Sequence, residues 1–181
     1  MTQVSAFPPP VLPGLRNLLS RYAESTMWLA RYMERIENMA RLIEVTGSSV
    51  QASNMDAGWD SVIRINADDA LFFQHHETAT ERSVVSFYIT DRDNPDSIVS
   101  MARCARENAR VLRPLISTEM WMHLNVFTRW VMELGPDDVG AGYLSTLCTR
   151  LKQECQTHFG ITEGTLYRDQ AWLFYVLGKY R

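Results

Sequence analysis

The chain has 181 residues, of which 46% are hydrophobic and 22% are charged, a balance typical of a single compact globular domain. Its net charge of -3 excludes a general attraction to nucleic acid or to anionic membranes. No apolar run approaches the roughly 18 residues that a membrane-spanning helix needs, and the first residues lack the apolar core of a secretory signal. We therefore expect a cytoplasmic protein that acts without nucleic acid and without a membrane.

The first 17 residues form a proline-rich segment that cannot be regular helix. We divide the chain into an extended lead-in over 1–17 and a single helical domain over 18–181. Three cysteines give an odd number at no disulfide-framework spacing, which favours a reducing compartment and thiols that serve as small apolar side chains. They are Cys104, Cys148 and Cys155.

The segment from Trp28 to Val45 carries the clearest pattern of the sequence. Apolar residues recur there three or four positions apart, which predicts a long helix from about Arg21 to about Ala52 with Ser20 as its N-cap. Further apolar residues lie on the opposite side of this helix. A helix that is apolar on more than one side is usually buried by more than one neighbour, so we expect it at the centre of the domain.

Candidate N-caps predict three shorter helices after this segment. They are Asn54 or Asp56, Asp68 or Asp69, and Thr78 or Thr80. The third segment, ERSVVSFYI, also suits a strand because β-branched and aromatic residues favour sheets. With no partner strand in view, we predict a helix.

The segment DRDNPDS is the clearest break in the chain. Asn94 as N-cap and Pro95 at the first helical position predict a helix that runs to about Arg113. Three further helices are predicted: from Ser117 or Thr118 to Gly135-Pro136, from about Val139 to Phe159 before Gly160, and from Asp169 onward. The predicted fold class is all-α, a multi-helix bundle around the long N-terminal helix.

An acid, an amide and a guanidinium recur together on two predicted helices, in ENMAR from Glu37 and in ENAR from Glu107. One interpretation is a polar pocket between two packed helices, with arginines that hold a carboxylate or phosphate. The other is a set of helix-stabilising ion pairs, as the spacings of Glu37 with Arg41 and of Arg31 with Glu34 allow. We favour ion pairs for Arg103 and Arg106. The candidate residues of the polar pocket are Arg31, Glu34, Arg35, Glu37, Asn38, Arg41, Glu81, Arg82, Glu107, Asn108 and Arg110.

Motifs of metal, nucleophile and phosphate chemistry are missing from the sequence. Cys155 and His158 have a spacing that could serve one metal ion, but both lie on an apolar stripe with Leu151, so we favour core packing. There is no G-x-S-x-G, P-loop or G-x-G-x-x-G motif. We expect neither a metal site nor a cofactor.

The end of the chain resembles the start of the long helix. YVLGKY from Tyr175 matches MWLARY from Met27 position by position in character. If this is an internal repeat, a second copy begins where the sequence stops.

Three segments of the sequence together resemble the bacterial alpha-E domain family, over a range from about Leu18 to the C-terminus. They are LLSRYAESTMWLARYMERIENMARLIEV, TERSVVSFYITDRDNPDSIVSMARCARENAR and STEMWMHLN. The resemblance implies an entirely helical domain, with a Glu-x-x-Arg motif that Glu107 and Arg110 match. Members accompany ATP-grasp ligase-like, transglutaminase-like and proteasome-like proteins. They usually continue with a second Glu-Arg pair, so the resemblance leaves open whether this domain lacks the family's second half.

Three hypotheses about function follow. The first is an accessory module of a peptide ligation or modification system, with an ATP-grasp-type ligase or a transglutaminase-like protein as its partner. The second is an enzyme of unknown reaction, in which Glu34 with Glu37 or Glu107 acts as acid and base while arginines hold an anionic substrate. These arginines would be Arg35, Arg41 and Arg110. The third is a structural bundle that forms a homodimer.

Overall fold

The computed structural model describes residues 20–53, 58–135, 138–140, 142–166 and 170–180. These residues form eight helices and no strand, which confirms the predicted all-α class. The helices are α1 (Ser20–Ser53), α2 (Gly58–Asn66), α3 (Asp69–Phe72), α4 (Glu81–Ile89), α5 (Ile98–Val111), α6 (Thr118–Glu133), α7 (Leu144–Leu166) and α8 (Gln170–Tyr180). None of these helices combines the length and the apolar character that crossing a membrane requires.

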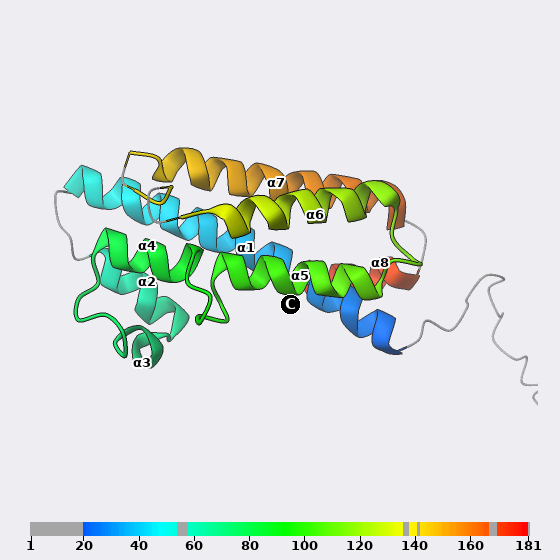
Figure 1. Cartoon of the computed structure of the whole chain (residues 1–181), viewed down its shortest axis with the longest axis horizontal. Helices are drawn as coiled ribbons and strands as arrows, with labels where there is room; N and C mark the ends of the chain where they lie inside the picture. The colour runs from blue at the N-terminus through cyan, green and yellow to red at the C-terminus, as the bar shows by residue number, and fades with distance from the viewer. Residues whose placement is uncertain (1–19, 54–57, 136–137, 141, 167–169, 181) are drawn as a thin grey trace, which may run out of the picture.

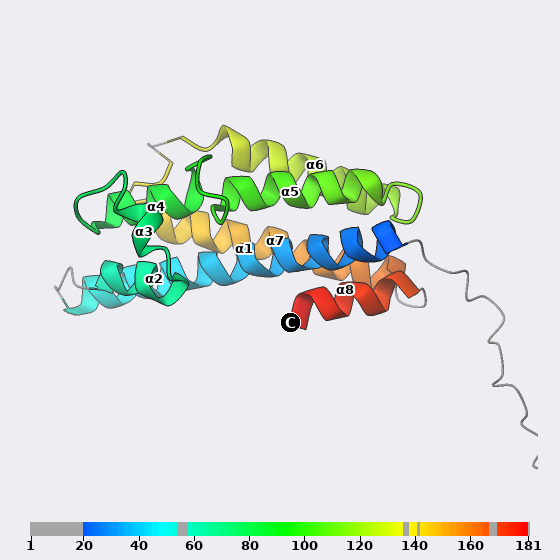
Figure 2. The same cartoon turned by 90° about the horizontal axis from the view of Figure 1, so that it is seen from below.

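Helix α6 packs on α5 and α7, whereas α5, α7 and α8 pack along α1, which runs the length of the helical body (Figure 1). Helices α5, α6 and α7 alternate in direction beside it, and α8 returns along the first half of α1 in the same direction as α1 (Figure 2). Helix α1 contacts α2, α4, α5, α7 and α8. Its fully buried side chains are Leu29, Ala30, Met33, Ile36, Ala40 and Ile43. The prediction of a long central N-terminal helix is confirmed.

Local hydrogen bonds explain where several helices begin. The Thr80 side chain accepts from the Ser83 backbone, and the Ser83 side chain bonds back to the Thr80 backbone, so a capping box opens α4. The Ser117 side chain accepts from the Met120 backbone and opens α6. The choice of helix over strand for ERSVVSFYI is confirmed.

Three predicted helix boundaries are wrong. Helix α7 begins at Leu144 rather than near Val139. Asn94 does not cap α5: its oxygen accepts from the Asp96 backbone and its amide donates to the Phe87 carbonyl, which makes a turn, and α5 starts after Ser97. Gly160 does not end α7, which continues to Leu166 because its buried face continues beyond the exposed glycine. The predicted caps Asn54, Asp56 and Asp169 lie outside the described residues.

Helices α1 and α8 approach each other closely at Gly178, where a Cβ would overlap the Met27 carbonyl oxygen. In the internal echo, Gly178 corresponds to Ala30, which is fully buried. The echoed segments therefore lie side by side along parallel helices, with Gly178 of α8 against the Met27 backbone of α1 (Figure 2). Small residues allow two helix backbones to approach closely.

We expect Gly178→Ala to lower the free energy of unfolding by about 2 kcal/mol, because the new methyl group meets backbone that cannot move alone. Chemical denaturation followed by circular dichroism measures this change. Gly160→Ala is the matched control, since no atom lies within 4 Å of its added Cβ. That control should be stabilising by about 0.5–1 kcal/mol, as expected for alanine in a helix interior. Equal effects of the two substitutions would contradict the close approach of α8.

Candidate functional site

The adjacent residues Glu34 and Arg35 of α1 point in different directions, as neighbours on a helix must. Burial raises the pKa of the Cys155 thiol and of the Tyr175 hydroxyl, and the Glu34 carboxylate adds to both shifts. Glu34 therefore faces α7 and α8. Its Oε1 accepts from Asn38 Nδ2 at 3.3 Å, whereas its Oε2 is buried with no hydrogen-bond partner among the described residues.

Arg35 instead forms an ion pair with Asp96 at 2.7 Å, in the turn before α5. This pair borders a hollow of about 240 Å³ between α1, α2 and α5, which Asn38 also lines. The structure thus brings Arg35 and Asn38 to one hollow. Both side chains of the ion pair are more than a third exposed, so the pair contributes little to stability.

Glu37 pairs with Arg41 at 2.7 Å, as the spacing predicts, and Gln156 of α7 lies 3.5 Å from the same Glu37 oxygen. The pair that the spacing allows between Arg31 and Glu34 is not formed. The Arg31 guanidinium lies over the Trp28 ring, 5.6 Å from its centroid, and Glu34 bonds one turn further along to Asn38.

The second acid–amide–guanidinium group, ENAR from Glu107 on α5, makes a separate set of contacts. Glu107 pairs with Arg106 at 3.1 Å and with Arg110 at 2.9 Å, and Asn108 donates to the Cys104 carbonyl. No hydrogen bond or ion pair of the described residues joins this group to Glu37 and its partners. The two echoes therefore do not form one shared pocket.

Glu81 and Arg82 lie apart from both echoes, at the start of α4. Neither side chain makes an ion pair within the described part of the chain. That these two residues contribute to a site stays a prediction.

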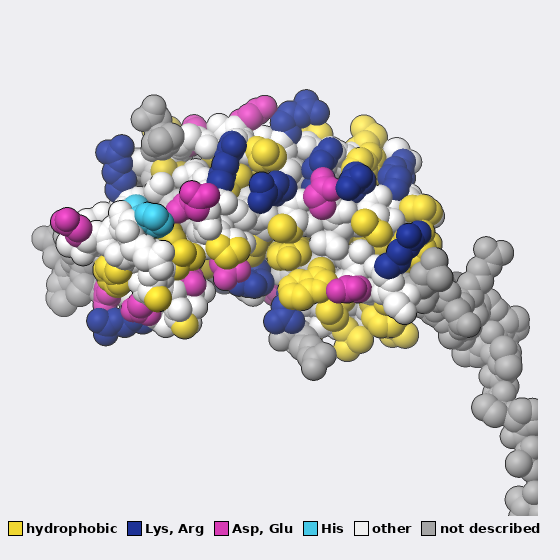
Figure 3. Space-filling view, turned by 60° about the horizontal axis from the view of Figure 1, so that its bottom comes forward, with side chains coloured by type: hydrophobic (Ala, Val, Ile, Leu, Met, Phe, Trp, Pro, Cys, Tyr) yellow, Lys and Arg dark blue, Asp and Glu magenta, His cyan; other side chains and the backbone are white. Residues whose placement is uncertain are grey.

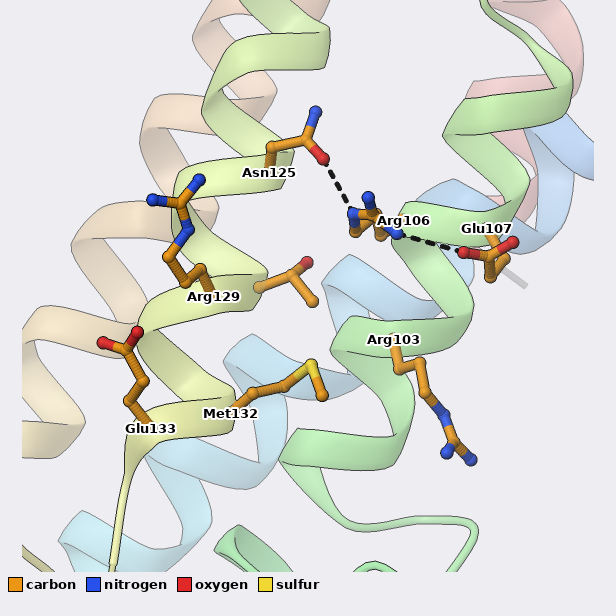
Figure 4. A pocket seen from close by; sticks show the side chains of 8 residues that line it. Arg103, Arg106, Glu107, Asn125, Arg129, Met132 and Glu133 are labelled. Carbon is orange, nitrogen blue, oxygen red and sulfur yellow. Dashed lines mark hydrogen bonds and ion pairs between the residues drawn. The ribbon is translucent and has the colours of Figure 1, made fainter.

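A larger hollow of about 460 Å³ lies between α5 and α6, and we call it the arginine groove. Its lining residues are Arg103, Arg106, Glu107, Asn125, Thr128, Arg129, Met132 and Glu133. Figure 4 shows Arg103 and Arg106 projecting from α5 and Arg129 from α6. In Figure 3, Lys and Arg side chains outnumber carboxylates across the face that carries α5 and α6.

Arg106 is held in place from three sides. Its Nε donates to Asn125 Oδ1 at 2.7 Å, its Nη1 pairs with Glu107 at 3.1 Å, and its guanidinium lies 5.7 Å from the centroid of the Trp121 ring. Asn125 is itself fixed, because its amide donates to the Trp121 carbonyl at 2.7 Å. Beneath the groove, the Thr128 hydroxyl donates to the Ala102 carbonyl and ties α6 to α5.

The groove has more guanidinium groups than carboxylates to neutralise them. Glu107 is shared by Arg106 and Arg110, and neither Arg103 nor Arg129 has an ion-pair partner among the described residues. Of the three lining arginines, Arg106 is held by α6, through Asn125. Arginines beside a hollow suit a carboxylate or phosphate ligand. The sequence signal was the spacing of Arg103, Arg106 and Arg110 on one face of α5.

A buried aromatic and polar cluster fills the space between α6, α7 and α8. His158 is fully buried, its ring lies about 6 Å from those of His123 and Tyr175, and neither of its ring nitrogens has a hydrogen-bond partner among the described residues. Burial, with smaller contributions from His123 and Lys179, lowers the pKa of His158 to about 3. No group of three or more potential metal ligands occurs among the described residues.

We expect His158→Leu to reduce the acid sensitivity of the fold. The lowered pKa means that, below about pH 6.5, the unfolded chain takes up a proton that the folded chain refuses until about pH 3. The stability of the unsubstituted chain therefore falls with pH in this window, by about 2 kcal/mol between pH 6.5 and 5. Denaturation at pH 7, 6 and 5 should show a shallower decline for the variant. His75→Leu, at an exposed position, is the control, and identical declines for all three chains would contradict this account.

We expect Glu34→Met to raise the free energy of unfolding by roughly 1 kcal/mol. Methionine has a similar length and removes a buried oxygen that lacks a partner among the described residues. Thermal and chemical denaturation measure the change. Destabilisation by Glu34→Met would mean that the carboxylate makes a favourable interaction in solution.

The comparisons with known proteins agree with this helical architecture. The model of the Alpha-E family, described as a predicted alpha-helical domain with a conserved ER motif, matches residues 18–181. Adjacent Glu-Arg pairs stand at Glu34-Arg35 and Glu81-Arg82, whereas the expected Glu107 and Arg110 are three positions apart. No curated protein and no solved structure matches the chain. Because the match covers nearly all of the sequence, the chain belongs to the Alpha-E family.

Proposed function

We propose that this domain is an accessory module of a bacterial peptide ligation or modification system. It binds an ATP-grasp-type ligase, its peptide substrate or a transglutaminase-like protein, and it performs no chemistry of its own. The observation that carries this proposal is the arginine groove, where Arg103, Arg106 and Arg129 exceed the carboxylates available to them. The partner classes come from the family resemblance. The three free thiols suit the cytoplasm.

An excess of arginines over carboxylates favours binding over acid–base catalysis. General acid–base catalysis needs a group that reaches the substrate and holds a proton at the working pH. In the arginine groove, Glu107 is already engaged by Arg106 and Arg110. A permanently charged guanidinium gives up no proton near neutral pH, but it binds an anion through two parallel hydrogen bonds.

The enzyme hypothesis is the alternative, and Glu34 is the residue that favours it. A buried carboxylate oxygen without a partner is unusual and often marks a functional group. This hypothesis predicts turnover of a substrate by the domain alone and loss of that turnover in Glu34→Gln.

The proposal predicts that the full chain binds an ATP-grasp-type ligase encoded beside it, and that salt weakens the complex. Arg103→Glu combined with Arg129→Glu should weaken binding at least about tenfold, because it places two negative charges where an anionic surface docks. Arg64→Glu, at an exposed arginine on α2 that lies outside the groove and outside the candidate site residues, is the matched control. Calorimetric titration at two salt concentrations measures the effect. Absence of binding at tens of micromolar to the ligase and to the transglutaminase-like protein would overturn the proposal.

A further inference from the structure

We infer that the arginine groove is a binding site for an acidic peptide segment in an extended conformation. Arg103, Arg106 and Arg129 receive the carboxylates of this segment. The inference rests on the proposed function, since it names the kind of ligand through which the module recognises its partner. Nothing in the family description assigns a ligand to this groove.

The first argument is that the Arg106 guanidinium is ordered before any ligand binds. Arg106 donates to Asn125 and Glu107, and Asn125 is anchored to the Trp121 carbonyl. A side chain that is ordered before binding loses less conformational entropy when the ligand arrives. Ordinary surface ion pairs do not show such support from a neighbouring helix.

The second argument is the spacing of the groove arginines on α5. Arg103 and Arg106 are three residues apart, which is about 4.5 Å along the helix axis at about 1.5 Å per residue. An extended peptide advances about 3.3 Å per residue and turns alternate side chains to one face, so carboxylates on that face are about 6.6 Å apart. A segment of about three residues therefore presents one carboxylate to each of these two arginines.

The third argument separates a peptide from a nucleic acid. Single-stranded nucleic acids stack their bases on free aromatic faces. Arg106 and Arg113 both lie over the Trp121 ring, and Arg150 lies 3.9 Å from the centroid of the Trp130 ring. Guanidinium groups thus already lie over both rings, and neither ring is among the residues that line the groove.

The hydrogen-bond donors of the ligand also distinguish a peptide from a nucleic acid. Glu107 and Glu133 line the groove together with the arginines. A phosphodiester backbone has no donor for these carboxylates and is repelled by them. A peptide backbone carries an N–H at nearly every residue and can donate to them, so a mixed lining of arginine and glutamate fits an acidic peptide better.

The test uses the full chain and a fluorescent, end-blocked hexapeptide of alternating glutamate and serine. Its counterpart with glutamine in place of glutamate is the control ligand. We expect the glutamate peptide to bind at least about tenfold more tightly than the glutamine peptide. Arg103→Gln and Arg106→Gln should each weaken the glutamate peptide about tenfold, as the loss of one charged hydrogen bond implies. Arg64→Gln, at an exposed arginine on α2, should leave binding unchanged.

Equal binding of the two peptides, or unchanged binding by both groove variants, would overturn the inference. So would tighter binding of a thymidine oligonucleotide at the same salt concentration. Because Arg106→Gln could also loosen the contact between α5 and α6, circular dichroism checks each variant. Amide resonances of the unsubstituted chain give a second measure: those of Asn125 and Thr128 should shift with the glutamate peptide, and shifts confined to other helices would contradict the site.

The two proposals fail in different ways. Ligase binding that survives Arg103→Gln, in a chain that does not bind the glutamate peptide, overturns the inference and leaves the accessory role standing. Binding of the peptide without binding of the ligase or the transglutaminase-like protein overturns the accessory role and supports the assigned ligand.

Discussion

The structure depends on the burial of α1 on several sides at once. Its apolar side chains are covered by α5, α7 and α8 along most of its length, and by α2 and α4 further along. The charged side chains of α1 must therefore reach solvent or a polar partner at the boundaries between the helices that cover it. Glu37 meets Gln156 of α7, Glu44 meets Lys152 of α7, and Arg35 meets Asp96 before α5. These polar contacts mark where the covering helices join.

Hydrogen bonds within a few residues could be predicted from the sequence, and longer ones could not. Thr80 and Ser117 start helices through bonds to a backbone N–H three residues ahead, so local sequence is sufficient. Asn94 has equally good cap chemistry, but its amide bonds to the Phe87 carbonyl seven residues back, and this tertiary bond displaces the start of the helix. Gly160 illustrates a different failure, because a glycine on an exposed face need not end a helix.

The candidate site shows the same limit. The spacing of Arg103 and Arg106 is visible in the sequence, and the predicted ion pair is confirmed for Arg106, which pairs with Glu107, whereas Arg103 forms none among the described residues. The spacing does not show what lies opposite them. Asn125, which fixes Arg106, and Arg129, which completes the groove, both come from α6. No pattern within one helix can predict a groove that two helices form together. Glu34 could be proposed from the residues near it in the sequence. That its carboxylate is buried while Arg35 pairs with Asp96 depends on which helices cover α1.

The arginine groove and the Glu34 carboxylate differ in how accessible they are, and this difference favours binding over catalysis. The arginine groove is open and lies on two helices that the buried Thr128–Ala102 hydrogen bond ties together, so it needs little rearrangement to receive a ligand. The Oε2 atom of Glu34 is sealed near Tyr175 of α8. In this conformation no substrate reaches that atom, and the close approach of Gly178 to Met27 resists a movement of α8 that would open a path to it. Binding in the groove is compatible with the fold as it stands, whereas catalysis at Glu34 requires another conformation.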